Sequence, residues 1–432
     1  NQTVSVLKVN VEVYEEDMVV TAILKTQDGQ LITGNVTLEI NTKFYKIVVV
    51  DGIGVRSIEK PSVGKYTYSA TYKGTDKISR AVDTGVFEVL PVDYNVILNA
   101  PDVKMIYHDG TRFTATLTDE KGNPIRDAAI EITINGRSYD KITDEKGGVS
   151  LGLNLDSGIY SVVVKFKGLP NYSPITKHAN VTIEPTVKGL DVVKMFRNST
   201  QYYAIFTDSH GNFLKNKNVQ FNINGVFYTK TTNDKGIAMM GINLNPGKYV
   251  ITVINLVTGE QSSNIITVKS LIVQKDLTKY YLNASRFQTT IYNKDGSLAV
   301  NKEVTFNING VFYHRTTDSN GVASLGISLR PGEYIITTMF DGLAIGNKVS
   351  VLPTLVTKNL NMKYLDGSSF TAQTLDGQGK PLANQNVSFN VNGVFYYKVT
   401  DNNGMAKLNI RLMHGEYIIT SCWNNFQTGN TI

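Results

Sequence analysis

The sequence predicts an all-β protein made of five antiparallel β-sandwich domains in tandem, on three observations. The octapeptide FNINGVFY occurs at Phe221–Tyr228 and Phe306–Tyr313, and returns as FNVNGVFY at Phe389–Tyr396. Short apolar–polar alternating runs are separated by turn residues about every 8 to 12 positions, as in sandwich folds. No segment shows the sustained i, i+3, i+4 apolar spacing of a helix.

The octapeptide predicts a β-hairpin. Its Asn-Gly pair is the strongest short signal for a two-residue type I′ turn, since both positions need positive φ. The residues before it, Phe221 to Asn224, alternate apolar and polar, which indicates a half-buried strand. A looser copy, ITINGRSY, occupies Ile132–Tyr139. Each copy is therefore expected to be one hairpin at a fixed point of a larger unit.

The larger unit is a repeat of 83 to 89 residues, measured between the hairpin glycines Gly136, Gly225, Gly310 and Gly393. An Asx-x-x-Gly turn follows each hairpin, and 13 residues separate its glycine from a tyrosine in all four copies. A degenerate copy without the Asn-Gly pair precedes them. The predicted repeats, which also serve as names below, are repeat 1 (1–92), repeat 2 (93–186), repeat 3 (187–270), repeat 4 (271–353) and repeat 5 (354–432).

Each repeat is expected to contain seven short strands and one structural tyrosine. The tyrosine follows a glycine corner at the start of the sixth strand, which is the position of a tyrosine corner. Its ring should enter the core and its hydroxyl should bond to backbone upstream. The five tyrosines are Tyr66, Tyr160, Tyr249, Tyr334 and Tyr417. Alternation from Tyr417 places Trp423 inward and Cys422 outward.

The hairpin also predicts a surface. A two-residue turn keeps cross-strand partners on one face, so Phe221, Ile223, Val226 and Tyr228 should share the core side. Phe227 then lies outward, opposite Asn222. The same register makes three phenylalanines candidate surface contacts: Phe227, Phe312 and Phe395. Such rings could stack on sugars or on another copy of the chain; alternatively, each could lie under a loop or on a lysine stem.

Composition excludes several classes of function. The net charge of +6 is spread along 432 residues without a basic run, so nucleic-acid binding is not expected. No apolar stretch approaches the roughly 18 residues that a membrane span needs. The single cysteine, Cys422, cannot form an internal disulfide. The five histidines share no metal-ligand spacing and fall at different points of the repeat, so no enzyme activity is expected.

Two other chemistries are alternatives to ordinary turns and strands. The aspartates of the turns, which lie in two sets (Asp119, Asp208, Asp376 and Asp144, Asp318, Asp401), could bind Ca²⁺ or could simply cap their own backbone. Each turn offers one or two carboxylates, so no cofactor is expected and Ca²⁺ is the alternative. Last-strand asparagines at matching places could form isopeptide bonds, but no lysine aligns across the repeats. Those asparagines are Asn180, Asn264, Asn347 and Asn430.

The motif pattern of repeats 2 to 5 resembles the immunoglobulin-like repeats of archaeal adhesin-like surface proteins, especially those of methanogens. Repeat 5 carries it most fully, in DGSSFTAQTLDGQGKPLANQNVSFNVNGVFYYKVTDNNGMAKLNIRL. It is more distantly similar to bacterial invasin- and intimin-type domains. Repeat 1 departs from the pattern. The resemblance implies an extracellular or cell-surface protein engaged in adhesion.

Two functions follow from this resemblance. The first is an adhesin-like stalk that attaches to cells or surfaces through a cell-surface glycan or protein, and the second is a subunit of a surface filament or coat that binds other copies of itself. Short, glycine-poor linkers favour an extended array in either case. Both ends lie near repeat boundaries, which predicts part of a longer array or an end-joining subunit. Candidate N-glycosylation sequons occur at Asn1, Asn35, Asn171, Asn180, Asn198, Asn283 and Asn386.

Overall fold

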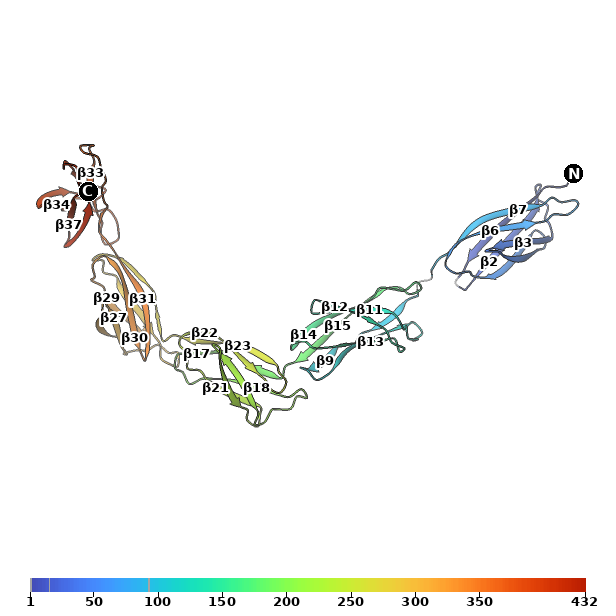
Figure 1. Cartoon of the computed structure of the whole chain (residues 1–432), viewed down its shortest axis with the longest axis horizontal. Helices are drawn as coiled ribbons and strands as arrows, with labels where there is room; N and C mark the ends of the chain where they lie inside the picture. The colour runs from blue at the N-terminus through green and yellow to red at the C-terminus, as the bar shows by residue number, and fades with distance from the viewer. Residues whose placement is uncertain (1, 15, 92–93) are drawn as a thin grey trace. The chain divides into compact units, whose positions relative to one another are not determined.

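The computed structural model describes residues 2–14, 16–91 and 94–432, and all the regular structure in these residues is β-strand (Figure 1). The strands of the described residues form ten sheets, which follow one another in pairs along the chain. This confirms the predicted fold class of β-sandwiches in series. The chain divides into two compact units, residues up to Pro185 and Thr186–Ile432. The predicted repeat boundaries remain predictions, and that at 92/93 lies outside the described residues.

Repeat 1 contains a three-stranded sheet, ordered β1-β2-β5, and a four-stranded sheet, ordered β4-β3-β6-β7. Its strands are β1 (Ser5–Val13), β2 (Asp17–Thr26), β3 (Gly34–Ile40), β4 (Lys43–Val49), β5 (Ile53–Glu59), β6 (Gly64–Tyr72) and β7 (Ala81–Val89). Their buried side chains form one apolar cluster between the two sheets.

Repeat 2 contains a three-stranded sheet, β13-β10-β8, and a five-stranded sheet, β12-β11-β14-β15-β9. Its strands are β8 (Val96–Asn99), β9 (Val103–Ile106), β10 (Arg112–Asp119), β11 (Ala129–Ile134), β12 (Arg137–Ile142), β13 (Gly148–Gly152), β14 (Gly158–Phe166) and β15 (Ile175–Glu184). A separate apolar cluster fills this sandwich.

Repeat 3 has the same two sheets, β16-β18-β21 and β17-β23-β22-β19-β20, and repeat 4 has β24-β26-β29 and β25-β31-β30-β27-β28. The strands of repeat 3 are β16 (Val187–Gly189), β17 (Val192–Met195), β18 (Gln201–Phe206), β19 (Asn218–Ile223), β20 (Val226–Thr231), β21 (Ile237–Gly241), β22 (Gly247–Ile254) and β23 (Gln261–Lys269). Those of repeat 4 are β24 (Ile272–Gln274), β25 (Leu277–Tyr280), β26 (Arg286–Ile291), β27 (Glu303–Ile308), β28 (Val311–Thr316), β29 (Val322–Gly326), β30 (Gly332–Phe340) and β31 (Leu343–Leu352).

Repeat 5 contains a three-stranded sheet, β32-β33-β36, and a four-stranded sheet, β35-β34-β37-β38. Its strands are β32 (Leu355–Thr357), β33 (Ser369–Thr374), β34 (Asn386–Val391), β35 (Val394–Val399), β36 (Met405–Asn409), β37 (Ile418–Trp423) and β38 (Phe426–Thr431). Its own apolar cluster lies between these sheets.

The expectation of seven strands is wrong for repeats 2 to 4, which have eight, because a short strand that was not predicted precedes the first predicted one. In repeat 2, β8 pairs with β10 in one sheet and β9 runs parallel to β15 in the other. Asp102 lies at the break between β8 and β9, where its Oδ1 accepts the backbone N–H of Asn180 at 2.8 Å. Asp191 and Asp276 do the same in repeats 3 and 4, at 2.8 Å from the nitrogens of Ile265 and Lys348. The carboxylate satisfies a backbone donor that strand pairing leaves open at the crossing.

The octapeptide phenylalanine is the centre of each later core. Phe221, Phe306 and Phe389 are fully buried. Each meets an aromatic ring of the opposite sheet edge-on, at centroid distances of 5.8, 6.0 and 5.8 Å, the partners being Tyr202, Phe287 and Phe370. Edge-to-face pairs of this kind contribute about 0.5–1.5 kcal/mol beyond the area they bury.

The predicted core positions of Val226 and Tyr228 are wrong. These side chains are 50% and 40% exposed, whereas their strand partners Ile223 and Phe221 are buried. The reason is the position of β20 at the edge of a five-stranded sheet, while the facing sheet has three strands. A side chain can point toward the sandwich interior and still lie beyond the sheet that would cover it.

Candidate contact surface

The hairpin edge strands β20, β28 and β35 are exposed along nearly their whole length. Phe227, Phe312 and Phe395 are 59%, 58% and 58% exposed, so neither a loop nor a lysine stem covers them. The observed register places them opposite Asn222, Asn307 and Asn390, as predicted. Exposed edges with apolar side chains are otherwise avoided, because they invite contact with other chains.

Strand pairing continues each phenylalanine into a row of side chains across the outer face of the sheet. In repeat 3 the row is Phe227, Asn222, Thr252 and Ser263. Repeats 4 and 5 have the same order of phenylalanine, asparagine and threonine, followed by glycine: Phe312, Asn307, Thr337, Gly346 and Phe395, Asn390, Thr420, Gly429. We call each of these a contact row. It joins an apolar ring to amide and hydroxyl groups that both donate and accept hydrogen bonds.

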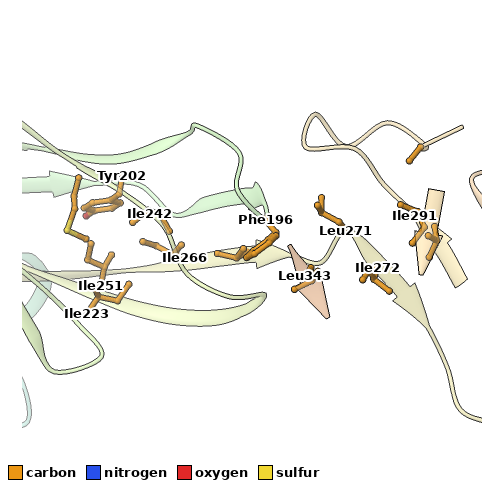
Figure 2. Packing of buried hydrophobic residues seen from close by; sticks show 14 of the residues in the cluster. Phe196, Tyr202, Ile223, Ile242, Ile251, Ile266, Leu271, Ile272, Ile291 and Leu343 are labelled. Carbon is orange, nitrogen blue, oxygen red and sulfur yellow. The ribbon is translucent and has the colours of Figure 1, made fainter. Parts of the chain in front are cut away.

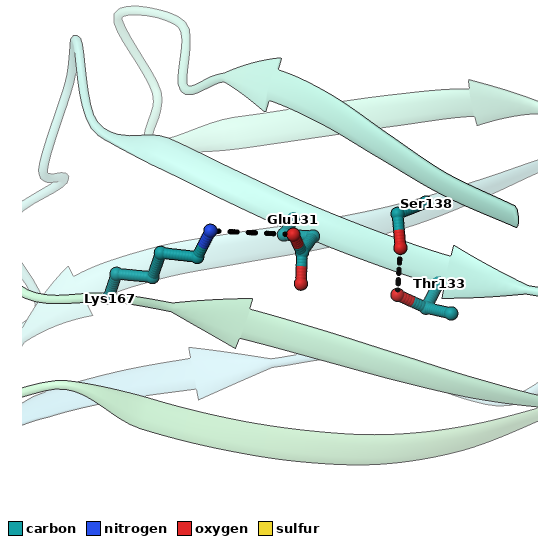
Figure 3. A network of polar contacts seen from close by, with 4 residues as sticks. All are labelled: Glu131, Thr133, Ser138 and Lys167. Carbon is teal, nitrogen blue, oxygen red and sulfur yellow. Dashed lines mark hydrogen bonds and ion pairs between the residues drawn. The ribbon is translucent and has the colours of Figure 1, made fainter.

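Repeat 2 lacks the ring in its matching row. Ser138 stands at the phenylalanine position, and its hydroxyl hydrogen-bonds that of Thr133 across the hairpin at 2.8 Å (Figure 3). On the same strand, Glu131 accepts a bond from the Lys167 ammonium at 3.4 Å. At the hairpin, this row of repeat 2 is therefore polar and internally paired.

Repeat 1 carries an exposed phenylalanine that was not among the predicted surface contacts. Phe44 is 67% exposed and pairs with Glu39, and the row continues through Ser69 to Thr84. An open hollow of about 570 Å³ lies on this face, lined by Glu39, Ser69 and Thr84 among others. Asn41 and Thr42 adopt positive φ without a glycine, at 46° and 60°, so the hairpin is kept. The sequence could have indicated this phenylalanine, because repeats 1, 3, 4 and 5 all have a Phe-Tyr dipeptide at this place.

The corner tyrosines share one geometry. Each ring is half-buried against the edge of its core cluster. Each hydroxyl donates to the carbonyl oxygen four residues upstream, at 2.5 to 3.0 Å; the donors are Tyr66, Tyr160, Tyr249, Tyr334 and Tyr417. This bond closes the glycine corner, and we propose that it is the reason for a tyrosine there.

The turn aspartates are committed to their own backbone. Asp208 Oδ1 accepts the N–H groups of His210 and Asn212, both at 2.9 Å. The other five have the same two bonds, to the residues two and four positions on: Asp119, Asp144, Asp318, Asp376 and Asp401. In the part of the chain that the structure describes, no three His, Cys, Asp or Glu side chains gather as a metal site would require.

These bonds hold the pKa of several turn carboxyls below the ordinary value. The amide of Asn123 lowers the pKa of Asp119, and the backbone N–H of Asn212 and of Lys380 lower those of Asp208 and Asp376. A depressed native pKa means that the unfolded chain binds more protons in acid. Stability from these groups is therefore complete above the unfolded pKa and is lost as the pH falls through the native one.

We expect the unfolding temperature to be nearly flat from pH 8 to 5 and to fall steeply below about pH 4, where unfolded aspartates begin to take up protons. Differential scanning fluorimetry across this range checks it. Asp208→Asn copies Asn293 of repeat 4 and should make the acid decrease shallower. An acid profile that this variant leaves unchanged would show that the turn carboxylate contributes nothing.

The sequon asparagines divide into two groups. Asn35, Asn171, Asn180 and Asn386 are exposed, whereas Asn198 and Asn283 are half-buried. Asn1 lies outside the described residues. The other last-strand asparagines bond to the strand-break residues: Asn264 to Asp191, Asn347 to Asp276 and Asn430 to Asn359.

Two residues near the C-terminus lie on opposite faces of β37. Trp423 packs against the core cluster of repeat 5, and its Nε1 donates to Gln385 Oε1 at 3.3 Å. Cys422, on the other face, is half-buried, with its sulfur 3.6 Å from Gln427 Oε1. The register is the predicted one, although the thiol is less open than expected.

The chain is thus a series of immunoglobulin-like β-sandwiches, and the proteins to which it is similar include bacterial adhesins. It is 21% identical over 414 residues to the inverse autotransporter adhesin YeeJ of Escherichia coli strain K12. That match takes in 80% of this chain and 17% of the relative, so the chain spans a small part of that protein. No family model matches the chain.

Solved structures of two bacterial proteins are also similar to the chain, at low sequence identity. Invasin, a bacterial integrin-binding protein, is 13% identical with a TM-score of 0.28, covering 94% of this chain and all of that one. A Ca²⁺-stabilised adhesin that helps an Antarctic bacterium bind ice is 15% identical with a TM-score of 0.20, covering 82% of this chain and 99% of the other.

The part of the chain that the structure describes contains no helix with the length and hydropathy of a membrane span.

Proposed function

We propose that the chain is an adhesin-like surface protein whose repeats make weak contacts many times over. One observation carries the proposal: three repeats place a largely exposed phenylalanine at the same register position, beside asparagine and threonine on the outer face. Folding does not require these rings, since repeat 2 forms the same hairpin with Ser138. Weak sites in series gain strength when several engage one surface, which is how a row repeated along a chain becomes useful.

The first candidate partner is a cell-surface glycan. A sugar ring presents C–H groups on one face and hydroxyls at its edge. The phenylalanine ring of a contact row suits the apolar face, while the adjacent amide and hydroxyl suit the edge. A surface protein remains the second candidate. In keeping with this role we propose an extracellular or cell-surface location and no catalytic activity.

The alternative function, a self-associating filament or coat subunit, is favoured by a different feature. β20, β28 and β35 are open sheet edges that carry exposed apolar side chains next to the phenylalanines, among them Val226, Val311 and Val394. An open edge can accept a strand from another copy through backbone hydrogen bonds. Light scattering of the purified chain distinguishes the two functions, because an adhesin stalk stays monomeric.

Two finer expectations remain proposals. We propose that the stability of the chain needs no Ca²⁺. In each turn one aspartate oxygen accepts two backbone N–H groups, and no turn contains the several carboxylates that a Ca²⁺ site usually has. The archaeal origin implied by the resemblance stays a prediction, and the relative and the two solved structures described above are bacterial.

The test of the proposed function replaces Phe227, Phe312 and Phe395 together by serine, the residue of repeat 2. We expect binding to a responsive glycan array, or to cells, to fall by on the order of 100-fold, because three sites are lost at once. The free energy of unfolding should change by no more than about 0.5 kcal/mol, as for other surface substitutions.

The matched control replaces Val250, Ile335 and Ile418 by serine. These side chains are exposed to a similar degree on the outer face of the same sheets but lie outside the contact rows. The control should bind as the parent does. If both variants lose the same amount of binding, general surface hydrophobicity explains the effect and the contact rows do not. A large loss of stability in the phenylalanine variant would show that the rings belong to the cores.

A further inference from the structure

Repeats 3 to 5 belong to one compact unit, and two joints within it are closed by contacts at corresponding positions. At the first joint, Phe196 of repeat 3 shares an apolar cluster with Leu271, Ile272 and Leu343 (Figure 2). At the second, the ring of Tyr281 meets that of Phe426 at a centroid distance of 5.6 Å. Each joint is formed by the loop that follows β17 or β25.

The same residue of each loop reaches the next repeat. Asn198 Nδ2 donates to the carbonyl oxygen of Lys294 at 2.8 Å, and Asn283 Nδ2 donates to that of Gly377 at 2.6 Å. Lys294 and Gly377 occupy the same place in their turns, directly after Asn293 and Asp376. The Oδ1 atoms of the two asparagines accept the N–H of Thr200 and Ser285 within their own loops. The bond to Oδ1 within its own loop thus orients each amide, and Nδ2 donates to the turn of the next repeat.

A buried lysine holds each of these loops. Lys194 is 5% exposed, and its ammonium donates to the carbonyl oxygens of Asn198, Thr200 and Ile242. Lys279 is equally buried and donates to those of Ser285 and Ile327, at 3.2 and 2.6 Å. A buried charge is costly unless its donors are satisfied. Here the carbonyl oxygens that satisfy it include those of the joint loop.

Repeats 2 and 5 differ at both positions. Methionine replaces the lysine at Met105 and Met362, and aspartate replaces the asparagine at Asp109 and Asp366. Asp366 Oδ2 accepts the N–H of Lys363, and Asp109 Oδ2 accepts that of Ile106, both at 2.9 Å. A carboxylate has no hydrogen to donate, so this side chain cannot make the bond that Asn198 and Asn283 make.

We propose that the Lys-x-x-x-Asn pairs Lys194–Asn198 and Lys279–Asn283 are latches that fix repeats 3, 4 and 5 to one another as a single rigid body. The lysine shapes the loop from inside its own repeat, and the asparagine amide bonds across the joint. Both asparagines are also sequon residues. Their Nδ2 atoms, where a sugar would attach, face the neighbouring repeat, so these two are the sequons least suited to carry a glycan.

The experiment measures the distance distribution across each joint by double electron–electron resonance. In the full chain with Cys422→Ser, nitroxides at Met239→Cys and Gln288→Cys report on the first joint, and those at Gln288→Cys and Lys407→Cys on the second. The three label sites are exposed positions in the middle of strands β21, β26 and β36. The parent should give one narrow distribution for each pair.

Asn198→Asp should broaden the first distribution alone, and Asn283→Asp the second alone. The variants lose a donor and set a carboxylate against a carbonyl oxygen, which should raise the open fraction on the order of tenfold. Folding should persist, since aspartate already occupies this position in repeats 2 and 5. Asn198→Gln, which keeps the amide but displaces it, should act in the same direction. Asp366→Asn, the reverse change in repeat 5, should leave both distributions unchanged.

Lys194→Met tests whether the lysine acts on the joint and not only on the stability of its own repeat. It installs the residue of repeats 2 and 5 and should broaden the first distribution without lowering the unfolding temperature. If the asparagine variants superimpose on the parent, the remaining contacts, including that of Arg197 with the carbonyl oxygen of Asp341, hold the joints and the latch is refuted. A broad distribution in the parent would refute it equally.

Discussion

Phe306→Ala should destabilise repeat 4 by about 3–5 kcal/mol, which corresponds to a decrease of roughly 15–30 °C in its unfolding temperature. The ring is fully buried and meets Phe287 edge-on at an interplanar angle of 88°. Its removal leaves a cavity between two sheets that are joined by strand pairing and cannot collapse fully. Calorimetry of the full chain measures the shift, and hydrogen exchange in β27 and β30 assigns it to repeat 4.

Phe312→Ala is the matched control, because it removes the same ring from the same hairpin. That side chain is 58% exposed and lies on the other face. Its loss should change the free energy of unfolding by no more than about 0.5 kcal/mol. If the two variants lose similar stability, the assignment of the hairpin faces is wrong, and the contact rows would be dropped with it.

Gly404→Ala should be the second strongly destabilising change, by about 3 kcal/mol or more. Gly404 has a φ of 71°, and a Cβ built there would lie 2.5 Å from the carbonyl oxygen of Thr374 and 3.0 Å from the nitrogen of Leu382. Those contacts are with backbone, which cannot rotate away. The turn would have to open and give up the bond from Thr374 N to Gly404 O. Chemical denaturation of the full chain checks this result.

Gly393→Ala supplies the comparison within repeat 5. Gly393 also has positive φ, 79°, but nothing lies within 4 Å of a Cβ built there. Its substitution should cost only the left-handed strain, about 1 kcal/mol. If both substitutions lower the free energy of unfolding equally, backbone strain alone accounts for the loss. A small shift of the backbone then relieves the crowding at Gly404.

The proposed function and the proposed latches complement each other. Weak sites in series bind well only when their spacing suits the partner surface, because a joint that bends freely lowers the effective concentration of the second site. Latched joints between repeats 3 and 4 and between repeats 4 and 5 would hold Phe227, Phe312 and Phe395 at set spacings. The latch variants can therefore be tested for binding as well as for distance.

Local chemistry determined much of the architecture. Asn-Gly pairs need positive φ at both residues, and the observed φ values of Asn224 and Gly225 are 53° and 76°. Once the turn is a two-residue one, the pairing of Asn222 with Phe227 follows. These features depend on residues next to one another in the chain, so the sequence alone predicts them, together with the all-β class and the outward side of the three phenylalanines.

Tertiary structure decided what depends on other strands. Val226 and Tyr228 are exposed because the facing sheet does not cover the edge strand. The residues of the hairpin do not determine the order of strands in the sheet. Asp102 lies between β8 and β9, and its carboxylate accepts the N–H of Asn180, which is distant in the sequence. From the sequence alone, Asn198 and Asn283 are predicted only as sequon asparagines. Only the contact between neighbouring repeats makes their amides the bonds between them.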